Sequence, residues 1–123
     1  MSLNALFVKP LTYVIETEPI RGTDYNGRYI GSTLNLNQRW CQHNCGFGSK
    51  FCKQNKPIRL VSVHCPKAND AMGVMCYENE LTLSIMREYI QKYGPDGWQS
   101  VRGGDYYRLH MSKPAVLSLA PPP

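Results

Sequence analysis

Runs of β-branched and aromatic residues occur in two separate parts of the first 33 residues. These runs, over 11–15 and over 28–33, predict two strands. Between these segments Pro19, Gly22 and Gly27 supply turn-forming residues. We therefore expect the first two strands to form a hairpin with a long loop.

Later in the chain the apolar spacing changes from strand-like to helical. Leu36 and Trp40 form a stripe at helical spacing, Thr33 or Asn35 is the expected N-cap, and Gly46 follows the end of this helix. The elements predicted after the hairpin are a helix over 34–44, a loop over 46–56, a strand over 58–65, a long helix over 70–93 and a strand over 101–110. The order ββαβαβ predicts an α+β fold with a small mixed β-sheet flanked by helices.

Length and composition narrow the classes of protein. A chain of 123 residues has room for one compact domain, which we place over residues 7–110, followed by a Pro-containing tail over 111–123. The net charge of +5 favours a polyanionic partner such as nucleic acid. No apolar window is long enough to cross a membrane. Five cysteines, an odd number without an apolar leader, favour a reduced intracellular setting.

Three side chains on the predicted helices have the types that phosphate chemistry needs. Arg39 and His43 are four residues apart, so they project from one helical face. Glu78 belongs to a mostly apolar face of the long helix, where a carboxylate is costly to bury unless a metal or a cation compensates it. Glu80 belongs to the polar face instead. Glu78 is therefore the predicted metal ligand, and a buried salt bridge between Glu78 and Arg39 is the alternative.

The two predicted hairpin strands carry Tyr13 and Tyr29, which are either proton acceptors or ordinary strand aromatics. A phenol with an unperturbed pKa near 10 is a poor base at neutral pH, so a catalytic tyrosine needs a nearby cation such as Arg39. His43 is the competing base, because an imidazole titrates near neutrality. The sequence leaves this choice open.

A basic segment with interleaved aromatics suits contact with phosphates and bases, although a solvated loop is the alternative. Its cations are Lys50, Lys53, Lys56 and Arg59, and Arg102 is predicted to extend it. The thiols of Cys41, Cys45 and Cys52 also raise a zinc site as an alternative, but no paired Cys-x2-Cys motif is present.

Together these residues resemble the GIY-YIG nuclease superfamily. Tyr29-Ile30-Gly31 matches the second motif, Leu11-Thr12-Tyr13 is a degenerate first motif, and Arg39, His43 and Glu78 occupy the positions of the family's helical arginine, histidine and glutamate. The sequence departs from the family at Ser32, where some members have a lysine. The late asparagine has no sure counterpart, since only Gln99 or Ser100 lies near its expected place.

The resemblance implies a compact endonuclease that hydrolyses DNA phosphodiester bonds with Mg²⁺ or Mn²⁺ held by Glu78. Tyr13, Tyr29, Arg39 and His43 are the other expected catalytic residues. Similar proteins come from viral and microbial genomes. We therefore expect the protein to act in the cytoplasm or nucleus, which would be that of a host cell if the source is viral. Selectivity would come from loops, DNA shape, a second copy or a partner protein. A non-catalytic nucleic-acid-binding module is the alternative.

Overall fold

The computed structural model describes residues 9–67 and 70–119, and these form the expected α+β fold. Residues 7–8 of the predicted domain and 120–123 of the predicted tail lie outside the described residues. The elements, in chain order, are β1 (Leu11–Pro19), β2 (Asn26–Thr33), α1 (Leu36–Asn44), α2 (Lys50–Gln54), β3 (Pro57–His64), α3 (Ala71–Tyr93), the 3-10 helix η2 (Gly97–Ser100), β4 (Val101–Gly103) and the 3-10 helix η3 (Ala115–Ser118).

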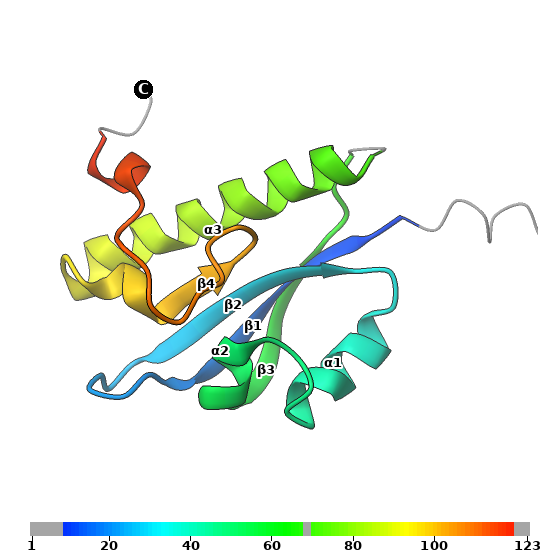
Figure 1. Ribbon diagram of the computed structural model, residues 1–123, viewed down its shortest axis with the longest axis horizontal. Coiled ribbons are helices and arrows are strands. Elements are labelled where there is room, and N and C mark those ends of the chain that lie inside the picture. Colours follow the sequence, from blue (N-terminus) through cyan, green and yellow to red (C-terminus); the bar gives the residue numbers. More distant parts are fainter. Residues whose placement is uncertain (1–8, 68–69, 120–123) are drawn as a thin grey trace, which may run out of the picture.

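The four strands form one mixed sheet in the order β3-β1-β2-β4. β1 lies antiparallel to both β2 and β3, which confirms the predicted hairpin, whereas β4 pairs with β2 in parallel. Figure 1 shows α3 along one face of the sheet and α1 and α2 on the other. The sheet therefore separates two apolar cores, one under each set of helices.

Alternation along the hairpin strands assigns each side chain to one of these cores. On β1, Tyr13 and Ile15 belong to the core under α1 and α2, while Val14 belongs to the core under α3. On β2, Tyr29 points to the first core and Ile30 to the second. Because successive side chains of a strand point to opposite faces, both tyrosines of the two motifs lie on the same face.

Two predicted elements differ from the observed ones. Part of the predicted loop over 46–56 is helix α2, whose first turn is capped by the Ser49 hydroxyl accepting from the Cys52 amide at 3.1 Å. The predicted strand over 101–110 ends at Gly103, because Gly104 has a positive φ of 52° and turns the chain. The predicted cap of α1 is confirmed at Asn35, one of two alternatives, and α3 is capped by Asp70.

Part of the predicted C-terminal tail packs against the long helix. Leu117 and Met111 lie against the core under α3. The guanidinium of Arg87 on α3 donates to the carbonyl of Val116 at 3.4 Å. The part of the tail that the structure describes therefore adds apolar contacts to the domain. Among the described helices, none combines the length and apolar character needed to cross a membrane.

Candidate active site

The histidine of helix α1 lies between the tyrosines of β1 and β2. The Tyr13 phenol oxygen and His43 Nε2 are 2.8 Å apart and share a hydrogen bond. The His43 ring meets the rings of Tyr13 and Tyr29 edge to face, with centroids 5.7 and 5.3 Å away. Both Tyr13 and His43 are 1% exposed. The structure thus brings together three predicted site residues from three different elements.

Two glycines make room for this cluster. A Cβ on Gly31, the last residue of the Tyr29-Ile30-Gly31 motif, would collide with the phenol oxygen of Tyr13. A Cβ on Gly48 would collide with Nδ1 of His43. The motif glycine therefore leaves space for the Tyr13 phenol of the neighbouring strand. Gly48 was missed by sequence reasoning, because its contact with His43 depends on how the loop after α1 folds back.

Burial keeps the His43 imidazole neutral. Desolvation, and then the positive charge of Arg39, lower the pKa of His43 to about 4. This pKa lies below the range near neutrality that was expected for the imidazole. Nδ1 of His43 is buried without a hydrogen-bond partner within the described part of the chain. The buried neutral ring is placed to position the Tyr13 phenol through their shared hydrogen bond.

Arg39 acts on both phenols. Burial raises the pKa of Tyr13 and of Tyr29, and the Arg39 guanidinium works in the opposite direction on each. Both phenols are consequently protonated at neutral pH. Arg39 also donates from Nη1 to the side-chain oxygen of Gln42 at 3.0 Å. This bond holds the guanidinium along its own helix, beside the two tyrosines.

Glu78 approaches the same region from the opposite side of the sheet. Its carboxylate accepts from the Ser32 hydroxyl at 3.1 Å and from the Gly104 amide at 3.2 Å. Burial raises the pKa of Glu78, and these two hydrogen bonds oppose that effect. The negative charge of Glu78 is also one of the causes that raise the pKa of Tyr29. The carboxylate and the motif tyrosine therefore lie near enough to influence each other.

The predicted register of the long helix holds. Glu78 is half-buried and Glu80 is exposed. Within the described residues no ion pair joins Glu78 to Arg39, which was the alternative role for this carboxylate. Thr12 and Ser32, two positions where the sequence departs from the family motifs, share a hydrogen bond of 3.0 Å beside Glu78. The carboxylate is thus oriented by hydroxyl and amide groups rather than by a cation.

The early end of β4 explains how residues from two faces of the sheet come together. β4 pairs with Arg28, Tyr29 and Ile30 of β2 and then stops. The last residues of β2 have no strand on that side within the described part of the chain. The turn at Gly104 passes this open end, where its amide reaches Glu78.

A cavity of about 530 Å³ opens beside this turn. Its walls come from β2, α1, the start of α2 and the segment after β4. The lining residues are Tyr29, Arg39, Ser49, Lys50, Gly104, Tyr107, Arg108, Leu109 and His110. Tyr13 and His43 are not among them, so of the two motif tyrosines it is Tyr29 that borders the cavity. Glu78 contacts its edge through Gly104.

The donor groups around Glu78 fit a magnesium ion that is bound mostly by water and phosphate. Mg²⁺ is usually held by one or two carboxylates and keeps several waters. Glu78 supplies one carboxylate whose orientation is fixed by two hydrogen bonds. Among the described residues no three His, Cys, Asp or Glu side chains gather as a metal cluster. A closed zinc site on the thiols would need such a cluster.

A comparison with known protein families matches the description GIY-YIG catalytic domain over residues 9–95. The chain belongs to the GIY-YIG family. Because this family consists of endonucleases, membership implies a nuclease-type function. No curated protein and no solved structure matches the chain.

The GIY-YIG match includes the basic segment. The structure places the residues predicted to bind nucleic acid in different parts of the molecule. Lys50, Lys53 and Lys56 are exposed on or beside α2. Phe51 is buried at 3% exposure, which removes it as a stacking group, whereas Phe47 is 81% exposed. The exposed lysines therefore remain candidates for phosphate contact on the face that carries the cavity.

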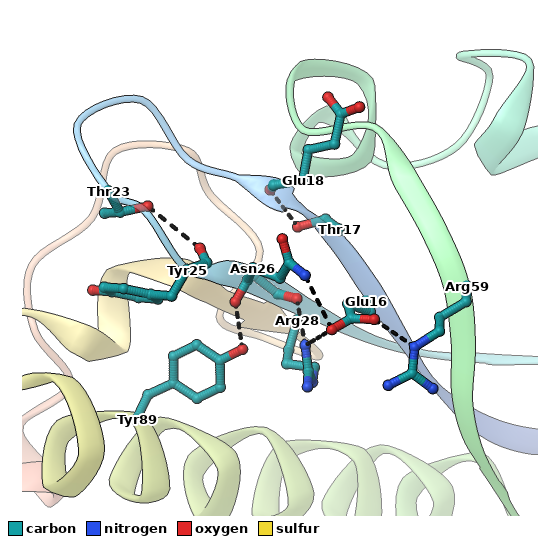
Figure 2. A network of polar contacts seen from close by, with 10 residues as sticks. Glu16, Thr17, Glu18, Thr23, Tyr25, Asn26, Arg28, Arg59 and Tyr89 are labelled. Atoms are coloured by element: carbon teal, nitrogen blue, oxygen red, sulfur yellow. Dashed lines mark hydrogen bonds and ion pairs between the residues drawn. The ribbon is translucent and has the colours of Figure 1, made fainter.

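Arg59, predicted to bind nucleic acid with these lysines, lies on the opposite face of the sheet. It pairs with Glu16, which also holds Arg28 and accepts from Asn26 (Figure 2). On β1, Glu16 shares the face of Val14, toward α3. Arg59 was misplaced because the sequence does not reveal that the basic segment turns from one face to the other at β3.

Arg102 was also predicted to extend the basic surface, but it is only 4% exposed. Its guanidinium lies over the Trp98 ring at 5.3 Å and donates to the carbonyls of Gln99 and Arg108, one on each side of β4. Burial lowers the pKa of Arg102 to about 10, so the side chain stays charged at neutral pH. Arg102 therefore stabilises the fold after residue 95, where the family match ends, and does not contribute to an exposed basic surface.

Of the two candidates for the late asparagine of the family, Ser100 is buried and Gln99 lies outside the cavity lining.

Proposed function

We propose that the protein is a divalent-metal-dependent endonuclease that hydrolyses phosphodiester bonds of DNA. The observation that supports this most is a cavity with basic walls that Tyr29 and Arg39 line and whose edge Glu78 reaches through the Gly104 amide. Hydrolysis of a phosphodiester needs stabilisation of negative charge, an oriented water and a site for a hard cation. The three residues supply one group for each requirement.

In this scheme each side chain has a separate task. Arg39 borders the cavity as a fixed positive charge and stabilises the negative charge that develops on the phosphate. Tyr29 borders the same cavity and orients the attacking water. The His43 ring packs against Tyr29 and is itself hydrogen-bonded to Tyr13, so these two residues position the Tyr29 ring. Glu78 would bind Mg²⁺ or Mn²⁺, which supplies Lewis-acid polarisation of a phosphate oxygen when bound. Water adds to phosphorus, the P–O bond breaks with its electron pair going to the leaving oxygen, and the proton released by the attacking water passes through solvent to that oxygen.

A cleavage assay with the purified full-length chain tests the proposal. Single-stranded, duplex, flap and branched DNA are each incubated with Mg²⁺, with Mn²⁺ and with excess EDTA. We expect cleavage of at least one of these substrates with either cation and none in EDTA. Cleavage that persists in EDTA would contradict the metal-dependent mechanism. Binding without cleavage under every condition would favour the non-catalytic nucleic-acid-binding module instead.

The lysines around α2 predict a measurable salt dependence of DNA binding. Each phosphate contact releases counterions, with a slope of about 0.9 per contact in a plot of log affinity against log salt for duplex DNA. Replacing Lys50, Lys53 and Lys56 with Ala should therefore reduce the slope by about two to three units. Fluorescence anisotropy over a salt series measures it.

A matched variant removes cations from the opposite face of the sheet. Arg59→Ala combined with Lys92→Ala deletes two exposed positive charges on the α3 side and should leave the slope nearly unchanged. If this control reduces the slope and the lysine variant does not, the DNA runs over the α3 face.

A further inference from the structure

The segment that follows β4 gives the active site a hollow shape. Tyr107, Arg108, Leu109 and His110 form one wall of the cavity, and Ser49 and Lys50 also line it. A volume of about 530 Å³ lies in the range of pockets that receive small molecules. Phosphate contacts along an intact duplex are made at its outer surface and do not need such a hollow. The cavity is suited to a group the size of a nucleotide.

The wall residues have the chemistry of a nucleotide site. Arg39, Lys50 and Arg108 contribute cations, and no Asp or Glu is among the lining residues, all of which the structure describes. Tyr107 is 56% exposed although it is a large aromatic side chain. The guanidinium of Arg108 lies 5.9 Å from the centre of the Tyr107 ring. A base can stack on an exposed aromatic ring while nearby cations hold the phosphates.

The wall is fixed in place by the buried arginine of β4. Arg102 donates from Nε to the carbonyl of Arg108 at 2.7 Å and from Nη2 to the carbonyl of Leu109 at 3.3 Å. Its remaining nitrogen donates to carbonyls before β4, including that of Gln99 at 3.1 Å. A wall that is held before the ligand arrives loses less conformational entropy on binding. Tyr107 and Arg108 are thus presented by a preorganised segment.

We infer that this cavity receives one unpaired nucleotide of the DNA next to the scissile phosphate, with its base stacked on Tyr107 and its phosphate held by Arg108 and Lys50. The inference rests on the proposed function and specifies its substrate as DNA with an unpaired nucleotide at the cleavage position. A base that is still paired and stacked in a duplex cannot enter the cavity without being extruded, which costs free energy. DNA that already has an unpaired base avoids this cost.

Binding measured without cleavage tests the inference. The 123-residue chain in EDTA is titrated into a fully paired duplex and into the same duplex with one unpaired 2-aminopurine. We expect affinity for the second DNA to be higher by about tenfold, the size of a single base–aromatic stacking contact. Fluorescence of the 2-aminopurine should be quenched on binding. Equal affinity for both DNAs, without quenching, would overturn the inference.

Substitutions of the wall tyrosine separate stacking from other effects. Tyr107→Ala should abolish the preference and the quenching, whereas Tyr107→Phe should retain both. Tyr93→Ala removes another exposed tyrosine, on α3, and should leave the preference intact. A preference that survives in Tyr107→Ala would overturn the assignment of Tyr107, provided that thermal melting shows the variant to be folded. Loss of the preference in Tyr93→Ala would place the unpaired base on the α3 face and also overturn it.

These outcomes are distinguishable from failure of the proposed function. EDTA removes the divalent cation, so the binding measurement does not depend on catalysis. Cleavage without any preference for an unpaired base would refute only the nucleotide site. A preference without cleavage in the assay with Mg²⁺ and Mn²⁺ would refute only the nuclease mechanism.

Discussion

Replacing Glu78 with Gln is expected to reduce DNA cleavage by more than about a hundredfold while the protein still folds and binds DNA. Gln keeps the shape of the side chain, and its single oxygen can accept from the Gly104 amide, while its NH2 group can donate to the Ser32 hydroxyl oxygen. It lacks the negative charge that a hard cation needs. Cleavage rates at saturating Mg²⁺, together with a melting curve and a DNA-binding isotherm, check all three expectations.

The folding expectation follows from the pKa of Glu78. Burial raises this pKa above its ordinary value, which means that folding disfavours the ionised carboxylate when no metal is bound. This destabilising contribution is present once the pH is high enough to ionise the group. Removing the charge therefore should not lower the melting temperature of the metal-free protein at neutral pH.

Glu80→Gln is the matched control, since Glu80 is exposed two residues away on the same helix. We expect its cleavage rate to stay within about twofold of the original, because an exposed charge of this kind contributes little. An active Glu78→Gln together with an inactive Glu80→Gln would exclude Glu78 as the metal ligand.

Arg39→Ala is expected to have the second-largest effect, a loss of about a hundredfold or more in turnover with DNA affinity within a few fold. The reason is that a fixed charge beside the cavity acts mainly on charge that develops in the transition state. The variant also removes the cation that opposes the burial-induced rise in the pKa of Tyr13 and Tyr29. Single-turnover cleavage measures the loss of turnover, and equilibrium binding measures the DNA affinity.

Lys53→Ala is a suitable comparison for Arg39→Ala. Lys53 is exposed on α2 but does not line the cavity. Its loss should weaken binding slightly at low salt and leave turnover nearly unchanged. If Arg39→Ala instead weakens binding strongly and turns over at the original rate, Arg39 contributes to ground-state binding only.

The arrangement of strands and long helices could be predicted because their patterns extend over many residues. β-Branched and aromatic residues run through the hairpin strands, and apolar residues recur at helical spacing over 70–93. Helix α2 has only five residues, too few for a helical period to be visible in the sequence. Strand β4 has three residues and depends on pairing with β2, which lies about 70 positions earlier.

The site was predictable to the extent that its residues belong to regular elements. Glu78 was separated from Glu80 by helical spacing alone, and the structure agrees. Arg102 could not be assigned correctly, because its partners are backbone carbonyls whose position depends on the folded segment after β4. Tyr107 was not singled out for the same reason. Its exposure and its place in the cavity wall are properties of the tertiary structure.

Strand β4 also sets a limit for any shortened version of this protein. The family match ends at residue 95, yet Trp98 and Val101 lie in the core under α3 and are 5% and 0% exposed. A chain cut at residue 95 would lose these contacts and leave β2 as an unpaired edge. Unpaired edges invite strand pairing between molecules and hence aggregation. Shortened versions for expression should therefore keep the residues up to 119 rather than stop at the homology boundary.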